Sequence, residues 1–487
     1  MNKNISFVLA ALLIFLYSSI GIVLLLHHEP WEDEAHTWLV ARDLDIISIF
    51  KQMAYDGTPS LWYMFLVPLA KMGLPYESEF ILHLIIAIAA VTLFVLYAPF
   101  SKITKVFFIF SYYMAYEYSI IARSYCLSIL LLFLIATLYG KRFEYPLWYA
   151  SLIFLLFNTN AHSVFTASSL TVLFMWESYR EKASGTFTKL SVFVMAMGGA
   201  LSLLQLLPRS DSINYNHIIG SIYLAPLVVT ANAFFPWHPL LVQGKQLLIV
   251  IAMAISILFM ITLSLFKRPP ALFILLLSLS GLFYIFAFVY AGALRHHGFI
   301  LILSLFSLWI STYYHDSNKK PFRIASNPKL PRISIAIITI CLALSLPYSL
   351  KIQYLEYNYL FSGAKEMADF IKRSNLDNYT IVAHPSPFAS ALLPYLPGKR
   401  FWYAGIEDYG TFVHYNKKYI NGSLISNSEV IARMKKNFPE KSKTLLLLST
   451  PLSSLESDNF TLLYKVDEAF GYNNEKYYLY RSVQKEP

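Results

Sequence analysis

Long apolar runs separated by short polar segments occupy the first 350 residues of the chain. An α-helix needs about 20 predominantly apolar residues to cross the hydrocarbon core of a bilayer. The first run has no small-x-small cleavage site and many more runs follow it, so we interpret it as a retained helix rather than a signal peptide. The pattern predicts eleven membrane-spanning helices, near residues 5–26, 80–99, 106–121, 124–140, 146–161, 163–177, 190–207, 246–266, 271–292, 298–314 and 333–350.

A connecting segment of unusual length, residues 27–79, joins the first two predicted spans. Within it, LVARDLDIISIFKQM has the apolar spacing of an amphipathic helix that lies in the membrane interface. The stretch 61–74 is apolar but too short to span, so we expect it to lie along the membrane surface or dip into it.

The pattern changes after residue 350, where long apolar runs give way to short ones. A helix-like segment at 362–374 is followed by strand-like runs at 379–383, 443–450 and 460–466. Mixed helices and strands of this length are typical of a small α/β domain. We therefore expect residues 1–350 to form a polytopic α-helical membrane domain and residues 351–487 to form a separate α/β domain.

Basic residues indicate the orientation in the membrane. If the N-terminus is cytoplasmic, the connections on that side hold most of the lysines and arginines, although the outer connections are longer in total. Cytoplasmic loops carry such an excess, so we expect a multi-pass protein of the inner (plasma) membrane with a cytoplasmic N-terminus. An odd number of spans then places the C-terminal domain in the periplasmic or extracellular space.

Composition agrees with a membrane protein and narrows the function classes. Hydrophobic residues make up 56% of the 487 residues and charged residues only 14%, whereas soluble domains carry roughly a quarter charged residues. The formal charge of +10 is spread between apolar runs rather than gathered in one patch, so no nucleic-acid partner is expected. Cys126 and Cys341 both fall in predicted spans, which leaves no disulfide framework or cysteine-based metal site.

Polar residues near span ends fall almost entirely on the predicted outer face. Chance would divide them between the two faces, so a one-sided set indicates a site that opens outward. The set comprises Asp33, Glu34, Asp56, Glu117, Arg123, His162, Arg209, His217, His238, Arg295, His296 and His297.

The acidic stretch WEDEAHTW begins just after the first span. Asp33 and Glu34 either lie in a solvated loop or are held at headgroup depth by Trp31, Trp38 and Trp62, since tryptophan anchors at the membrane interface. Desolvated carboxylates at that depth are suited to act as a general base or to bind a cation. Both interpretations are compatible with the pattern.

Three further side chains have a structural and a functional interpretation. Arg123 is either a snorkelling arginine or a ligand for an anionic headgroup, because a guanidinium can bind phosphate oxygens with two hydrogen bonds. Arg295, which begins RHHG, is either an interfacial anchor or a functional residue, the default for ionisable groups in a membrane. His162 is either a hydrogen-bonded structural histidine or part of the same site. P-loop, GxSxG, HExxH and GxGxxG motifs in a suitable context are absent from the sequence.

Several of these motifs together resemble a known family. The acidic pair Asp33-Glu34 follows the first span, and DGTPSLWY (56–63) stands where the family has a D-x-HPP-L-Y-Y stretch. Further similar segments are AKMGLPYESEFILHL, IIARSYC around Arg123, Arg295 itself, and FSGAKEMADFIK in the tail. The chain is thus similar to the GT-C glycosyltransferases, in the branch that includes protein O-mannosyltransferases and the bacterial 4-amino-4-deoxyarabinose transferases of lipid A. It departs from the pattern at Thr58 and Ser60, where the family has histidine and proline.

The resemblance implies a function. Members transfer a sugar from a polyprenyl-phosphate carrier to an acceptor, which is a lipid such as lipid A of lipopolysaccharide, a glycan or a protein, on the non-cytoplasmic side of the membrane. It implies Asp33 as the general base, with Glu34 or Asp56 orienting the acceptor or a divalent cation. Arg123 and Arg295, with His162 as a further candidate, would then bind the donor phosphate. No nucleotide site is required, because the sugar arrives activated on lipid.

Three other functions compete with this prediction. A polymerase or ligase that moves whole lipid-linked glycans usually has a large outer loop late in the chain and does not need the Asp33-Glu34 motif. A lipid-sugar transporter or flippase should show inverted repeats and helices broken at the midplane, which the sequence does not suggest. A structural scaffold gives no reason for the one-sided acids and arginines.

Overall fold

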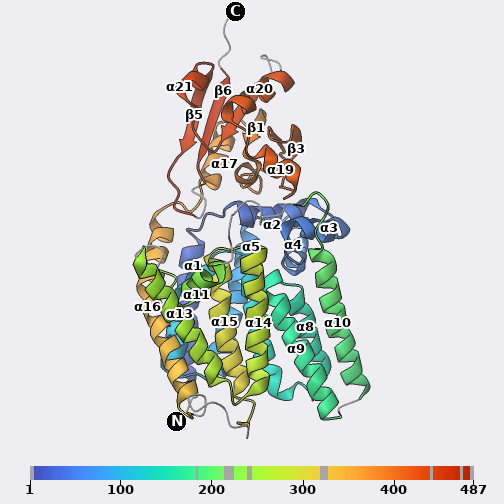
Figure 1. The fold of residues 1–487 in the computed structure, drawn as a ribbon. Coiled ribbons are helices and arrows are strands. Elements are labelled where there is room, and N and C mark those ends of the chain that lie inside the picture. Colours follow the sequence, from blue (N-terminus) through green and yellow to red (C-terminus); the bar gives the residue numbers. More distant parts are fainter. Residues whose placement is uncertain are drawn as a thin grey trace, which may run out of the picture.

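A computed structural model describes residues 5–182, 185–212, 224–237, 244–317, 327–438, 443–471 and 475–482 of the protein. A bundle of helices carries a smaller sheet domain at one end (Figure 1). The first helix begins at the opposite end of the bundle from the sheet domain (Figure 1). The chain is therefore a polytopic helical protein with a small C-terminal sheet domain.

Within the described ranges, eight helical segments are long and apolar enough to cross a membrane. α10 and α13 expose large apolar side chains such as Phe193 and Phe259, both about 60% exposed, which water would disfavour and lipid would not. α15 by contrast is buried along nearly its whole length and forms the centre of the bundle. The eight are α1 (Phe7–Leu25), α5 (Glu77–Tyr97), α7 (Ser124–Leu138) with the 3-10 turn η2 (Tyr139–Lys141), α10 (Thr186–Leu206), α13 (Lys245–Ser264), α14 (Pro269–Phe288), α15 (Leu294–Ser311) and α16 (Leu330–Asn358).

The other three predicted spans correspond to an interrupted helix, a short helix, and α9 (Ala161–Arg180), which is 20 residues long but is not among the eight apolar helices. The stretch 106–121 is divided between α6 (Lys102–Ile109) and a π-helical turn, η1 (Tyr113–Glu117), after which the chain leaves helical geometry before Arg123. Tyrosine hydroxyls in this stretch donate to distant partners, which outweigh the local preference for a continuous helix. The remaining helices of the bundle are α8 (Pro146–Phe157), α9 (Ala161–Arg180) and α11 (Ala225–Phe234).

Three short helices lie across the end of the bundle that faces the sheet domain: α2 (Glu32–Asp43), α3 (Ile46–Asp56) and α4 (Leu61–Lys71) (Figure 1). The single amphipathic helix expected over LVARDLDIISIFKQM is instead two helices, because Asp45 caps α3 by accepting a hydrogen bond from the Ser48 amide. α2 begins earlier than expected, so the acidic stretch forms its first turn. Carboxylates are favourable there because the amino end of a helix carries partial positive charge.

The C-terminal domain is a six-stranded sheet with strand order β3-β2-β1-β4-β6-β5. β1 is parallel to β2 and β4, whereas β3, β5 and β6 pair in antiparallel fashion. The strands expected near 380, 445 and 463 and the helix expected near 368 are confirmed. The domain comprises β1 (Thr380–His384), β2 (Phe401–Tyr403), β3 (Asp408–Gly410), β4 (Thr444–Leu448), β5 (Phe460–Val466), β6 (Tyr477–Ser482), α17 (Ala364–Arg373), α18 (Ser386–Ser390), α19 (Lys417–Gly422), α20 (Asn427–Asn437) and α21 (Ser454–Ser457).

The sheet domain docks on the short helices of the first loop. The Arg42 guanidinium donates to the Leu393 carbonyl (3.2 Å), and the Glu32 amide donates to the Glu475 carboxylate (2.8 Å). Burial raises the pKa of Glu475 to about 7. The acidic first turn of α2 therefore lies between the bundle and the sheet domain.

Candidate active site

Asp33 forms ion pairs with two arginines that are distant in the sequence. Its Oδ2 atom lies 2.8 Å from a terminal nitrogen of Arg295 and 3.5 Å from one of Arg123. Arg123 also donates to the Asp33 carbonyl at 2.8 Å. The structure thus brings together three residues that the sequence singled out, from the starts of α2, α7 and α15.

The two guanidiniums dominate the electrostatics of this cluster. Burial alone would raise the pKa of Asp33, but Arg123 and Arg295, with a contribution from His36, more than offset it and hold the pKa below its usual value. The Asp33 carboxylate in turn raises the pKa of Arg123 against the opposing effect of burial. Asp33 and Arg123 are therefore both charged at neutral pH.

The cluster is partly open and bordered by aromatic rings. The side chains of Asp33 and Arg123 are about 20% exposed and that of Arg295 is 9% exposed. The Arg295 guanidinium lies 5.0 Å from the centre of the Trp31 ring, within range of a cation–π interaction. Because α2, α7 and α15 all begin here, their amino ends add partial positive charge. An anion reaching the cluster would meet two guanidiniums and three helix amino ends.

Glu34 points away from this cluster into a fully buried set of hydrogen bonds. Its carboxylate accepts from His28 (3.1 Å) and from the Ala122 amide (2.6 Å), next to Arg123. The second ring nitrogen of His28 lies 2.7 Å from Glu356 in the last turn of α16, which also accepts from Tyr116. We call His28, Glu34 and Glu356 the buried clamp. Burial alone would lower the pKa of His28, but the two carboxylates raise it to about 10, so the clamp holds an imidazolium.

Asp56, the last residue of α3, pairs with a histidine that lies near Asp33. Its carboxylate accepts from His36 (3.0 Å), Tyr63 (2.8 Å) and Gln52 (2.8 Å). His36 lies on α2 close enough to Asp33 to lower its pKa. Its Nδ1 atom is buried without a hydrogen-bond partner among the described residues. Asp56 and His36 therefore form a second polar group beside the first.

His162, near the start of α9, lies in a ring cluster next to the arginines. Its ring centre is 4.9 Å from that of His296, the residue after Arg295, and 5.8 Å from that of Tyr125. Within the described ranges neither of its ring nitrogens has a hydrogen-bond partner, although both are buried. The structure thus places His162 in the neighbourhood of Arg295 and leaves its nitrogens available.

The three acids do not form a common metal site. Asp33 pairs with arginines, Glu34 with His28, and Asp56 with His36. Across the part of the chain that the structure describes, no group of three or more histidine, cysteine or acidic side chains is arranged to hold a metal ion. His217 and His238, which the sequence also placed on the outer face, lie outside the described residues.

Sequence reasoning did not single out His28, His36 or Glu356. His28 and His36 lie within HHEPWEDEAHTW, and histidines so close to acids are a usable signal for a hydrogen-bonded group. Glu356 gave no such signal, because its partners are hundreds of residues away in the chain.

Comparison with known proteins does not identify a function for this site. No family model, curated protein or solved structure matches the chain. The resemblance to the GT-C glycosyltransferases therefore rests on the motifs alone, and a function has to be argued from the arrangement of the site.

Proposed function

We propose that this protein is a membrane glycosyltransferase that moves a sugar from a polyprenyl-phosphate donor to an acceptor on the non-cytoplasmic face of the membrane. The observation that carries the proposal is the carboxylate of Asp33 held between the guanidiniums of Arg123 and Arg295. A transferase of this kind needs one base and a cationic site for a phosphate, side by side. The partly exposed cluster supplies both.

The donor phosphate would compete with Asp33 for the two arginines. Without donor, the pKa of Asp33 is held low by the guanidiniums, which makes its carboxylate a weak base. When phosphate oxygens take over these hydrogen bonds, the Asp33 carboxylate regains basicity. Proton abstraction is thereby favoured only when the donor is bound.

The bond changes balance without a cofactor. The acceptor oxygen or nitrogen attacks the anomeric carbon of the sugar, while Asp33 takes the acceptor proton. The bond between the anomeric carbon and the phosphate oxygen breaks, and its electrons leave with the polyprenyl phosphate. Arg123 and Arg295 stabilise the charge that develops on this leaving group. The pair of His36 and Asp56 would orient the acceptor.

The sequence prediction suggests which side of the membrane the proposed site faces. Eleven spans with a cytoplasmic N-terminus would place the sheet domain and the Asp33 cluster outside the inner membrane. The donor's prenyl chain would then run along the apolar faces of the bundle. The acceptor, whether lipid A, a glycan or a protein, would approach from the side of the sheet domain.

The decisive experiment supplies the purified protein with a panel of polyprenyl-phosphate sugars and follows release of polyprenyl phosphate by mass spectrometry. We expect one sugar to be consumed by the wild type and not by Asp33→Asn, which keeps the shape of the side chain. Asp43→Asn, at the other end of α2, is the matched control and should retain activity. Full activity in Asp33→Asn would contradict the assignment of the base, and consumption of no donor would contradict the function.

A further inference from the structure

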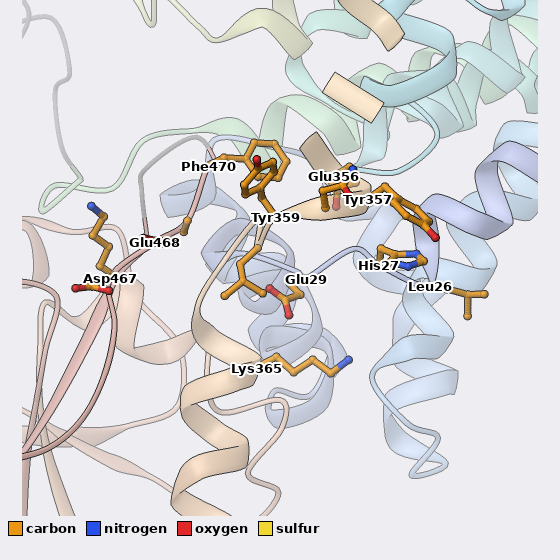
Figure 2. A pocket seen from close by; sticks show the side chains of 14 residues that line it. Leu26, His27, Glu29, Glu356, Tyr357, Tyr359, Lys365, Asp467, Glu468 and Phe470 are labelled. Atoms are coloured by element: carbon orange, nitrogen blue, oxygen red, sulfur yellow. The ribbon is translucent and has the colours of Figure 1, made fainter. Parts of the chain in front are cut away.

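A cavity of about 700 Å3 lies between the ends of two predicted spans and the sheet domain, apart from the Asp33 cluster. It is lined by the segment after α1, the last turn of α16, the start of α17 and the loop after β5. Figure 2 shows Glu29 and Lys365 as neighbours in it, with His27 and Tyr357 beside them. The proposed glycosyl transfer makes no use of this cavity.

The cavity presents charges of both signs that are not paired with each other. The Oε2 atom of Glu29 is buried and has no hydrogen-bond partner among the described residues. Burial raises the pKa of Glu29 to about 7, and nearby Lys365 opposes the shift. In the described ranges no carboxylate lies within 4.0 Å of the Lys365 ammonium. The Oε2 atom of Glu29 therefore lacks a donor, and Lys365, although near Glu29, forms no direct ion pair in the described ranges.

One side of the cavity, at the end of the spanning helices, carries exposed apolar and aromatic side chains, and we call this side the mouth. Leu26 is 77% exposed, and Tyr357, whose ring lies 4.2 Å from that of His27, is 51% exposed. Tyrosines are enriched at the depth of lipid headgroups. Below the mouth, α1 and α16 continue as exposed apolar surface that includes Ile22 and Leu350. A ligand with a polar head and apolar chains fits both regions at once.

We infer that this cavity binds the headgroup of an aminophospholipid, with its primary ammonium at Glu29, its phosphate at Lys365, and its acyl chains along α1 and α16. An ammonium supplies the donors that Glu29 lacks, and a phosphate supplies the anion that Lys365 lacks. An anionic lipid without an amine leaves Glu29 unsatisfied and meets Glu468, which lines the cavity together with Lys476 and with Asp467, whose carboxylate is paired with Lys465. A soluble amino phosphate leaves the apolar mouth uncovered. The inference does not depend on the proposed transferase activity.

The wild-type protein tests the inference directly. Purified, delipidated full-length protein in detergent would be titrated with phosphatidylethanolamine, phosphatidylcholine, phosphatidylglycerol and soluble phosphoethanolamine, with bound lipid counted by native mass spectrometry. We expect phosphatidylethanolamine to bind about tenfold more tightly than the other two lipids, which is the scale of one charge-assisted hydrogen bond. Equal binding of all three lipids contradicts the inference. Equal binding of soluble phosphoethanolamine contradicts the lipid assignment.

Matched variants test whether the lipid binds in this cavity. Glu29→Gln should reduce the preference for phosphatidylethanolamine over phosphatidylcholine by about tenfold, because the amide does not attract an ammonium. Lys365→Gln should weaken binding of phosphatidylethanolamine, whereas Lys372→Gln, on the same helix but outside the cavity lining, should not. The melting temperature of each lipid-free variant verifies that it folds. Retention of the wild-type preference by folded Glu29→Gln overturns the assignment.

Discussion

Asp33 and Glu34 are adjacent in α2, yet they meet different surroundings because successive residues of an α-helix point about 100° apart. One carboxylate reaches two arginines and the other reaches the buried clamp. The sequence placed both acids at the same kind of site, since it shows which residues are unusual but not the direction in which each side chain points. It singled out Arg123 and Arg295 as either structural or anion-binding residues, and the structure brings both to one carboxylate. In the proposed function, the donor phosphate would take the place of that carboxylate between the two guanidiniums.

Replacement of Arg295 tests the phosphate-binding role at the level of one residue. Arg295→Gln should lower kcat by about 10²–10³, the scale for loss of one charge-stabilising donor. Arg295→Lys should recover part of this loss, because it keeps the charge but not the two-pronged hydrogen bonding. The measurement is kcat and KM for the lipid-linked donor. Arg268→Gln, which disrupts an exposed ion pair with Asp316 at the start of α14, is the control and should leave both constants unchanged. An Arg295→Gln enzyme with normal kcat would refute the role.

The buried clamp predicts a dependence of stability on pH. The pKa of His28 is raised to about 10 in the folded protein, so its contribution to stability is fully present below pH ~6.5 and is lost as pH rises through about 10. The wild-type melting temperature should therefore fall between pH 7 and 10. His28→Gln should melt lower at pH 7, because loss of one partner from a buried pair costs about 3–5 kcal/mol, and should lose this part of the slope. If the melting temperatures of the two proteins changed with pH in parallel, the imidazolium would not be stabilising. His27→Gln, exposed and next in sequence, is the control.

At the scale of elements, the interruption of the expected span near 106–121 explains how Arg123 reaches the site. A continuous helix would carry Arg123 along the bundle wall, whereas the π-helical turn and the following non-helical residues deliver it to the start of α7. Two tyrosine hydroxyls hold this interrupted segment in place: Tyr113 donates to the Asn232 carbonyl and Tyr118 to the Arg295 carbonyl. Apolar periodicity does not report such contacts, because a buried tyrosine fits a spanning pattern equally well. The strands of the sheet domain were easier to predict, since short apolar runs between polar turns rarely form any structure other than a strand.

The interrupted segment packs closely against α15 at Gly298, so we predict that a larger residue there destabilises the protein. A Cβ atom at Gly298 would lie 2.5 Å from the Tyr113 ring and 2.6 Å from the Tyr118 hydroxyl. Both rings are tied by hydrogen bonds and cannot move away freely, so Gly298→Ala should destabilise the protein by about 1–3 kcal/mol, the usual cost of overpacking. Because Tyr118 binds the Arg295 carbonyl, activity should fall as well. Gly185→Ala, where a Cβ meets nothing within 4 Å, is the control for thermal melts and for turnover. Equal melting temperatures of the two variants would contradict this account of the packing.

At the scale of the whole molecule, the sheet domain completes the surroundings of the site. The ring of Tyr415, in the loop before α19, lies 5.1 Å from that of His36, so the sheet domain reaches the polar group that includes Asp56. The sequence predicted a separate domain on the same side as the first loop. It contained no signal for the docking contacts, because these join residues more than 350 positions apart, as in Gln52 and His414. Such contacts are fixed only when both surfaces are folded.

The pair of Gln52 and His414 tests whether docking matters for turnover. Gln52 donates to Asp56 and to the Val413 carbonyl, and its carbonyl oxygen lies 2.7 Å from Nδ1 of His414, so it connects the sheet domain to Asp56, which would orient the acceptor in the proposed function. We expect Gln52→Ala and His414→Ala each to raise KM for the acceptor and to speed proteolysis between α16 and α17. The loss of transition-state stabilisation in the double variant should be about 1 kcal/mol smaller than the sum of the losses in the two single variants. Each single change already removes the hydrogen bond that the two residues share. His315→Ala, exposed beyond the end of α15, is the control. Strict additivity would show that the two residues act independently and that the sheet domain does not position Asp56 through Gln52.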